Sequence, residues 1–152
     1  MVYEGNDTCV EITATDRCGN TATSCEEFKI DVTAPTIEIT FDQQEPKNGY
    51  FYREVRTATI HIEELNFDAQ GIELEITRDQ EPYEIFISDW QSDGSSHWAT
   101  VAFLEDGDYT MTVSCTDLAD NTSEEVSVEP FTIDLTKPEI EICYDNNEAK
   151  HD

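Results

Sequence analysis

The chain repeats itself at a spacing of about 100 residues. IDVTAPTIEI begins at Ile30 and IDLTKPEIEI begins at Ile133, while TDRCGNT begins at Thr15 and TDLADNT begins at Thr116. These separate blocks agree on one period, which is too long for a solenoid repeat and close to the size of a β-sandwich domain. The chain is therefore expected to be a window of a tandem array.

The two copies divide the chain into three parts. Residues 1–33 are expected to be the C-terminal strands of a preceding repeat, residues 34–136 a complete repeat, and residues 137–152 the first strand of the next repeat. A complete repeat of this size is long enough to bury a core of its own.

Within residues 34–136, apolar residues alternate with polar ones, which is the pattern of half-buried β-strands. No segment has the pattern of a helix of ordinary length. Pro130 interrupts the last strand, so that strand is expected to lie at an edge or to contain a bulge. The pattern predicts an all-β, antiparallel β-sandwich. Its expected strands are 37–41, 58–62, 72–76, 85–87, 98–103, 109–115 and 126–133.

One turn has the sequence of a known structural motif. Asp106-Gly107-Asp108-Tyr109 resembles the tyrosine corner of immunoglobulin-like sandwiches. In that motif a buried tyrosine hydroxyl donates a hydrogen bond to the backbone and fixes the turn into the next strand. Tyr109 is therefore expected to be a structural residue, and the sandwich is expected to be immunoglobulin-like.

Three longer segments together carry a family resemblance. TATIHIEELNFD (Thr57–Asp68), EDGDYTMTVSCTDLADN (Glu105–Asn121) and FTIDLTKPEIEICYDNN (Phe131–Asn147) are similar to the tandem bacterial immunoglobulin-like (Big-type) repeat domains of Gram-positive cell-surface proteins. The shared motifs are Glu-x-Asn-Phe, Asp-Gly-x-Tyr, Thr-Asp-x-Ala-Gly-Asn and Ile-Asp-x-Thr-x-Pro, with Asp120 where glycine is usual and Gly19 retained in the first copy. The resemblance implies an extracellular array, wall-attached or secreted, that acts as a stalk, an adhesin or a host-protein binder.

Acidic residues dominate the charge of the chain. Against 35 Asp and Glu there are 8 Lys and Arg, which gives a formal net charge of −27. Nucleic acids and anionic membrane surfaces are excluded as partners, because each phosphate contact would be opposed by a strongly negative field. A hydrophobic content of 38% argues against disorder, and no apolar run approaches the roughly 20 residues of a membrane span.

Five cysteines, an odd number, leave at least one without a partner inside the chain. The strand rhythm places Cys9 and Cys25 on the outward face of one hairpin, so a Cys9–Cys25 disulfide is the first expectation. A Cys18–Cys25 disulfide and free thiols are the alternatives. Cys115 shares the inward face of its strand and is expected to be buried. Cys143 has no assigned partner, and no C-x-x-C pair indicates a zinc site.

No pattern in the chain indicates an enzyme. G-x-S-x-G, H-E-x-x-H and P-loop sequences are all missing from the sequence. The three histidines are His61 on an outward strand position, His97 in a serine-rich turn and His151 in the tail. The expectation is a non-enzymatic domain without catalytic residues.

Calcium is the one ion that the acidic residues suggest. Tandem extracellular sandwiches can stiffen their joints with hard cations held by oxygen ligands. No D-x-D-x-D-G loop is present, and Asp and Asn in turns are also explained by local backbone hydrogen bonds. We therefore assign no metal ligand and no cofactor, and a solvated acidic surface is the alternative to a calcium site. The residues concerned are Asp16, Asp31, Asp117, Asp120, Asn121 and Asp134.

Four aromatic residues fall outside the strand alternation: Tyr50, Phe51, Tyr52 and Trp90. They are candidates for partner binding, since Tyr and Trp are enriched at binding hot spots, or they cover the end of the core. Loops or an exposed sheet edge would provide the contact.

Two functions follow as expectations. The first is an extracellular module of a repetitive bacterial surface protein that presents or makes adhesive contacts to a host macromolecule, such as immunoglobulin or a glycoprotein. The alternative is a structural spacer, stiffened by calcium, in a stalk whose binding head lies elsewhere. In both, the neighbouring repeats of the same chain are partners.

Overall fold

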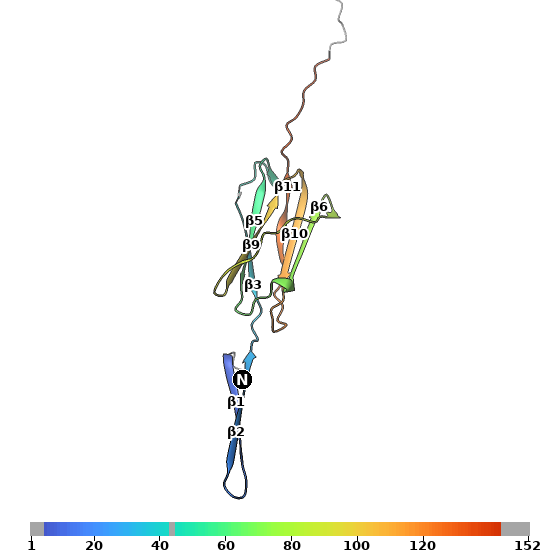
Figure 1. The fold of residues 1–152 in the computed structure, drawn as a ribbon. Helices are drawn as coiled ribbons and strands as arrows, with labels where there is room; N and C mark the ends of the chain where they lie inside the picture. Colours follow the sequence, from blue (N-terminus) through green and yellow to red (C-terminus); the bar gives the residue numbers. More distant parts are fainter. Residues whose placement is uncertain (1–4, 43–44, 144–152) are drawn as a thin grey trace, which may run out of the picture.

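The computed structural model describes residues 5–42 and 45–143 as an almost entirely β protein (Figure 1). Helical structure in these ranges is limited to one 3-10 turn, η1 (Ala69–Gly71), and no described helix is long and apolar enough to cross a membrane. The strands are β1 (Gly5–Thr15), β2 (Thr21–Ile30), β3 (Thr36–Phe41), β4 (Phe51–Tyr52), β5 (Arg56–Glu63), β6 (Ile72–Arg78), β7 (Glu81–Pro82), β8 (Gln91–Asp93), β9 (Ser96–Phe103), β10 (Gly107–Cys115) and β11 (Val126–Ile133).

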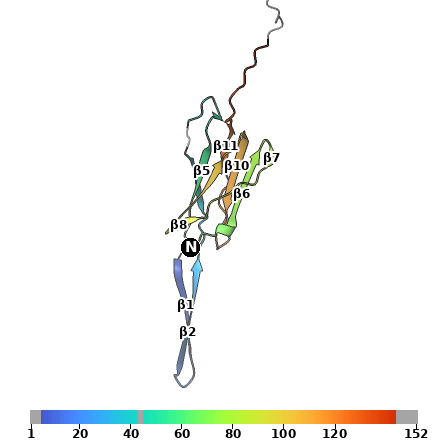
Figure 2. The same ribbon diagram turned by 45° about the horizontal axis from the view of Figure 1, so that its top comes forward.

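β1 and β2 form an antiparallel hairpin that stands apart from the other two sheets (Figures 1 and 2). The register places Cys9 and Cys25 on one face of this hairpin. The other face carries Val10, Ile12 and Phe28, which are exposed, because within the described residues no second sheet packs against the hairpin. Their apolar character is that of a face that a second β-sheet would cover.

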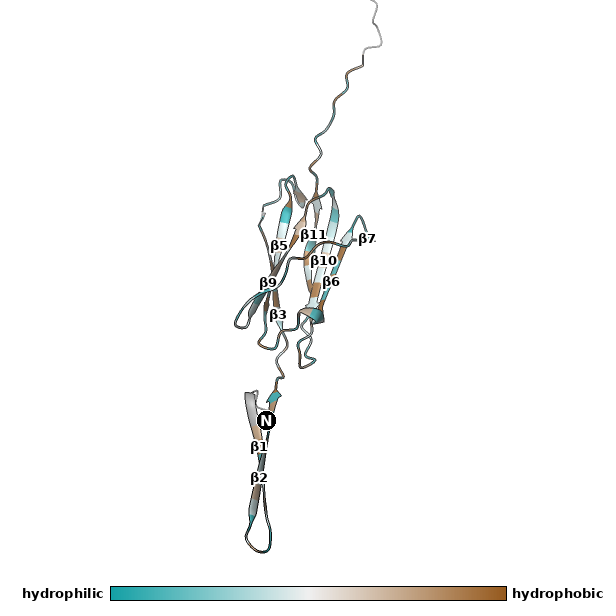
Figure 3. Cartoon of the chain, in the orientation of Figure 1, coloured by the Kyte–Doolittle hydropathy of each residue, from teal (hydrophilic) through white to brown (hydrophobic). Residues whose placement is uncertain are grey.

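Strands β3 to β11 form a sandwich of two sheets. The strand order is β4-β11-β10-β6-β7 in one sheet and β3-β5-β9-β8 in the other. The pairs are antiparallel, except for the short parallel pairing of β4 with β11. Hydrophobic and hydrophilic positions alternate along β6 in Figure 3, as the sequence IELEITR requires. The predicted all-β, antiparallel β-sandwich is confirmed.

The core lies between the two sheets and is largely aliphatic and aromatic. Aromatic rings cluster around Phe131, whose centroid lies 5.1 Å from that of Phe103 and 5.6 Å from that of Tyr109. The buried hydrophobic residues are Ala58, Ile60, Ile62, Ile76, Ala99, Val101, Phe103, Tyr109, Met111, Val113, Cys115, Phe131 and Ile133.

Tyr109 forms the hydrogen bond that defines a tyrosine corner. Its side chain is 1% exposed, and its hydroxyl donates to the carbonyl oxygen of Glu105 at 3.0 Å. Burial raises the pKa of Tyr109, so the phenol stays protonated and remains a donor. The turn between β9 and β10 is thereby held against the core.

The last strand contains the irregularity that Pro130 implies. The pairing register of β11 with β10 shifts beside Pro130, so β11 contains a bulge there. A proline has no N–H to donate to the ladder, and the bulge removes the need for one. The strand itself is not an edge strand, since β4 pairs with its other side.

Two segments expected to be strands, residues 85–87 and residues 137–143, are not in strands. Ile87 makes only an isolated bridge with Val101, because residues 83–90 cross from one sheet to the other rather than extending either. Residues 137–143 belong to no strand, and Ile140 is 87% exposed. A strand needs a neighbour to complete its hydrogen bonds, and no described sheet pairs with this segment. Residues 144–152, the remainder of that expected strand, lie outside the described residues.

Candidate functional site

Three acidic side chains meet where the hairpin segment joins the sandwich. Asp31 follows β2, Glu64 follows β5, and Asp117 follows β10. Each offers a carboxylate oxygen, and these oxygens all lie within 4.8 Å of one another. Glu64 is only 6% exposed and Asp117 only 3% exposed. We call Asp31, Glu64 and Asp117 the junction triad.

The loop after β10 fixes the position of Asp117. Its Oδ1 accepts hydrogen bonds from the backbone N–H of Ala119 at 2.7 Å and of Asn121 at 2.9 Å. Its Oδ2 accepts a bond from the side-chain amide of Asn121 at 2.9 Å. The Asp-x-x-x-Asn spacing therefore builds a loop that surrounds one carboxylate.

The hairpin at the start of the chain contains the same loop. Asp16 Oδ1 accepts bonds from the N–H groups of Cys18 at 2.8 Å and Asn20 at 2.9 Å, and Asp16 Oδ2 accepts the Asn20 amide at 2.8 Å. These bonds lower the pKa of Asp16. This repetition of structure at the repeated sequence shows that the loop is a property of the motif.

Hydrogen bonds to its backbone and to its carboxylate fix the position of Glu64. Its N–H donates to the Ser95 carbonyl at 2.8 Å, and its carbonyl accepts a bond from His97 Nε2 at 2.8 Å. Its Oε1 accepts the backbone N–H of Asn66 at 2.7 Å. The Glu-x-Asn sequence thus turns the Glu64 carboxylate toward the junction.

Two amides tie Asp31 to the sandwich. The side-chain amide of Asn66 donates to Asp31 Oδ2 at 2.5 Å, and that of Asn121 donates to the Asp31 carbonyl at 3.3 Å. Asp31 Oδ1 also accepts the N–H of Thr33 at 3.0 Å. Three motifs that are far apart in the sequence, Ile-Asp-x-Thr, Glu-x-Asn and Asp-x-x-x-Asn, therefore meet at one point.

The donor set of the junction triad suits a hard divalent cation. Ca²⁺ takes six to eight oxygen ligands at about 2.3–2.6 Å, so two ligands on opposite sides of the ion are about 5 Å apart. Three oxygens within 4.8 Å fit on such a sphere. Cys115 is near this site, but its thiol is protonated. Burial is the main cause that raises its pKa to about 11, and the negative charges of Glu64 and Asp117 raise it further. A protonated thiol is a poor metal ligand, which leaves oxygen chemistry.

Comparisons with known proteins agree with this architecture. Residues 52–135 match the profile of a bacterial Ig-like domain, and residues 1–73 match that of a bacterial Ig-like domain of group 3. The chain belongs to the bacterial Ig-like domain family. No curated protein and no solved structure matches it. Domains of this family typically occur in extracellular or surface proteins and are generally non-enzymatic structural modules.

The Ig-like sandwich brings together only some of the acidic residues suggested by the sequence. Asp31, Asp117 and Asn121 meet at the junction, whereas Asp16 lies at the tip of the hairpin. Asp134 lies at the opposite end, where its N–H donates to the Tyr52 carbonyl at 2.9 Å. Asp120 is exposed in the Asp117 loop with a φ of 65°, the left-handed conformation that the usual glycine would adopt freely.

Glu64 is the residue that sequence reasoning missed. It lies in the Glu-x-Asn-Phe motif, which contributed to the family resemblance but received no functional role. Two features of the sequence could have identified it. Glu64 is a charged residue at the end of an alternating strand, and neither a turn nor the core explains the motif that it begins.

The four aromatic candidates do not form one surface on this Ig-like domain. Tyr50 is 57% exposed and stacks on Phe51 with ring centroids 4.7 Å apart. Tyr52 packs instead against the core, with its ring 3.8 Å from the Arg56 guanidinium. Trp90 lies near the junction end of the sandwich, 5.2 Å from the ring of Phe67. The structure thus separates Trp90 from the other three by the length of β5.

The structure links Cys9 and Cys25 by a disulfide across the hairpin, with their Cα atoms 6.1 Å apart. Cys18 and Cys143 are exposed thiols, and Cys115 is a buried thiol. Cys18 is at the hairpin tip, in the loop around Asp16, so the alternative Cys18–Cys25 pairing is not formed.

The position expected for His97 was wrong. His97 lies within β9 rather than in a turn, is buried, and stacks on Phe67 with ring centroids 4.1 Å apart. Its Nδ1 shares a hydrogen bond with Ser92 Oγ at 2.7 Å, and its Nε2 holds the Glu64 backbone. His97 therefore supports the junction. His61 lies on β5 with its Nε2 3.4 Å from Glu63, and His151 is outside the described residues.

Proposed function

We propose that this Ig-like module is a spacer of an extracellular bacterial array, stiffened where repeats join by a calcium ion held between Asp31, Glu64 and Asp117. The observation that carries the proposal is the convergence of the junction triad. Asp31 comes from the linker after the hairpin, whereas Glu64 and Asp117 belong to the sandwich. A cation held by all three would fasten one repeat to the next.

The charge of the site supports a cation. Removing a carboxylate from water costs free energy unless an opposite charge compensates, and neighbouring carboxylates repel each other. Glu64 and Asp117 are both buried, and in the described part of the chain neither takes part in a salt bridge. Ca²⁺ would supply the missing positive charge and tie the junction together.

The other end of the sandwich supports a role as a spacer. Asp106 Oδ1 accepts the N–H of Leu135 at 2.7 Å, and Asp106 Oδ2 accepts the Thr136 hydroxyl at 2.5 Å. Asp134 Oδ1 accepts the Thr136 N–H at 3.1 Å, as Asp31 does with Thr33. The outgoing linker is therefore held as it leaves the sandwich, with Asp134 placed as Asp31 is at the first junction.

A calcium titration of the intact chain by calorimetry tests this function. We expect one saturable site in wild-type protein and its loss in Asp117→Asn. Asp120→Asn is the matched control, because it removes the same charge from the same loop but lies outside the junction triad. No saturable calcium binding, or equal loss in both variants, would overturn the proposal.

A second function, adhesion to a host macromolecule, is favoured by one specific observation. Tyr50 and Phe51 form an exposed stacked pair beside a hollow of about 760 Å³ that also includes Glu129 and Pro130. Exposed, pre-stacked aromatic rings offer a large contact area at little entropic cost. A host glycoprotein or immunoglobulin is the partner class that we propose for this surface.

Substitution of the pair tests the adhesive function. We expect Tyr50→Ser with Phe51→Ser to reduce binding to immobilised host glycoproteins or immunoglobulin by about tenfold or more. Trp90→Phe, at the other end of the sandwich, should leave binding unchanged. If wild-type protein binds neither class of host protein, or if both variants bind as wild type does, this function is wrong.

A further inference from the structure

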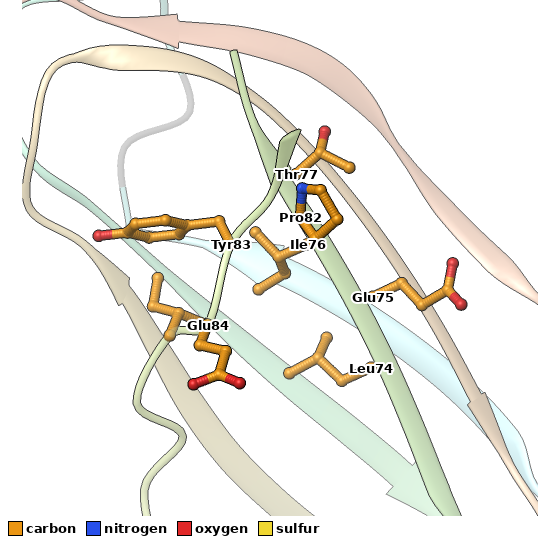
Figure 4. Close-up of a pocket in the computed structure, with 8 residues that line it drawn as sticks. Leu74, Glu75, Ile76, Thr77, Pro82, Tyr83 and Glu84 are labelled. Carbon is orange, nitrogen blue, oxygen red and sulfur yellow. The ribbon is translucent and has the colours of Figure 1, made fainter. Parts of the chain in front are cut away.

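The edge of the five-stranded sheet is only partly covered. β6 pairs with β10 along its length, but on its other side β7 pairs only with Thr77 and Arg78. The Tyr83 N–H still donates to the Ile76 carbonyl at 2.9 Å, and after Tyr83 the chain diverges from β6 and leaves a groove of about 600 Å³ (Figure 4). We call it the β6 groove.

Among the described residues, β6 turns backbone groups toward this groove that no neighbouring strand pairs with. The Gly71 carbonyl accepts the Thr116 N–H on the β10 side, whereas the Ile76 carbonyl accepts the Tyr83 N–H on the β7 side. Since backbone groups alternate in direction along an antiparallel strand, those of Ile72 and Leu74 point to the same side as Ile76. β7 does not reach them, so in the part of the chain that the structure describes they form an unpaired strand edge.

Apolar side chains form one part of the wall of the β6 groove. Leu74 and Ile76 line it from β6, and Tyr83 lines it from the neighbouring segment (Figure 4). Ile85 also lines the groove. Phe86, the next residue, is 82% exposed. Phe86 is not among the residues packed against the core, so its ring is available to contact a partner.

The rim of the β6 groove is acidic. Glu75 and Glu84 line it and are exposed, and Glu73 is exposed two residues before Glu75 on β6, in a chain whose net charge is −27. Arg78, the basic residue at the end of β6, is engaged with the Glu105 carboxylate and, at 2.5 Å, with the Asp106 carbonyl. The charge of the rim therefore selects a basic occupant and repels an acidic one.

We propose that the β6 groove binds an extended segment of a partner polypeptide in which Lys or Arg alternates with apolar residues. Its backbone pairs with Ile72 and Leu74 and adds a strand to the sheet. Its basic side chains face Glu73 and Glu75 on the outer face, and its apolar side chains contact the groove and Phe86. This surface shares no residue with the junction triad, so we expect the peptide to bind both with and without calcium.

Short synthetic peptides test the proposal on the intact chain. The probes are a peptide in which Lys alternates with Val, its counterpart with Glu for Lys, and a scrambled Lys/Val peptide with the same charge. We expect the alternating basic peptide to bind at least about tenfold more tightly than the other two, with and without calcium. Amide hydrogen exchange at Ile72 and Leu74 should slow when it binds.

Charge variants separate the β6 groove from the general negative field. Glu75→Lys with Glu84→Lys should weaken the basic peptide about tenfold, whereas Glu11→Lys with Glu38→Lys changes the net charge equally on other strands and should have little effect. Phe86→Ser should weaken binding without changing the melting temperature. Equal binding of the scrambled peptide, equal effects of the two double variants, or unchanged exchange at Leu74 would each overturn the proposal.

Discussion

Calcium should raise the melting temperature of this chain, and Asp117→Asn should abolish the rise. A ligand that binds only the folded state stabilises it by about 2.7 kcal/mol when its concentration is 100 times the dissociation constant. For a domain of this size, this corresponds to a rise on the order of 10 °C. Differential scanning calorimetry with excess calcium and with chelator measures the difference.

The controls separate the junction triad from general screening of an acidic protein. Asp120→Asn should keep the calcium-dependent rise, because Asp120 lies outside the triad. Glu64→Gln should lose it, as Asp117→Asn does. A rise that is equal in all three variants would mean that calcium acts on the overall charge, and no rise in wild-type protein would contradict a calcium-stiffened junction.

Gly71→Ala should destabilise the sandwich by about 2–3 kcal/mol. A Cβ atom at Gly71 would lie 2.0 Å from the carbonyl oxygen of Thr116 and 3.0 Å from its carbonyl carbon. Both are backbone atoms, and the Thr116 N–H donates to the Gly71 carbonyl at 2.8 Å, so neither side can move without breaking this bond. Urea unfolding followed by tryptophan fluorescence gives the change in free energy of unfolding.

Gly94→Ala is the matched control for this clash. Gly94 has a φ of +69° and nothing within 4 Å of a Cβ, so its substitution costs only backbone strain, about 1 kcal/mol. Gly71→Ala should also weaken calcium binding, because Thr116 precedes Asp117 in the loop. If Gly71→Ala were no less stable than Gly94→Ala, the close approach of Gly71 to Thr116 would not exist in solution.

Much of the fold could be predicted from the sequence because it depends on local patterns. Strand alternation identifies β3, β5, β6, β9, β10 and β11, since each has one face toward the core. Pro130 implies a bulge through its missing N–H, and the turn before Tyr109 implies a tyrosine corner. Ile85 and Ile87 were misleading, because alternation also occurs in a segment that covers the core while it crosses between sheets.

The candidate site was harder to predict because it depends on which ends of the strands meet. Sequence spacing could not show that Glu64 at the end of β5 lies beside Asp117 after β10, or that Trp90 lies far from Tyr50. The wrong prediction for His97 has the same cause. Its serine-rich neighbours suggested a turn, but His97 packs on Phe67, hydrogen-bonds the Glu64 backbone and is buried. Tertiary neighbours decided these cases.

The disulfide across the hairpin changes how this part of the chain transmits tension. Cys9 and Cys25 are 16 residues apart in sequence and directly bonded in the structure. A pulling force that enters through β1 passes through the sulfur atoms to β2 and bypasses the residues between them. That segment would extend by about 50–60 Å if it were drawn out. While the disulfide is intact, the segment between the two cysteines does not extend when the chain is pulled, and the loop around Asp16 carries no load.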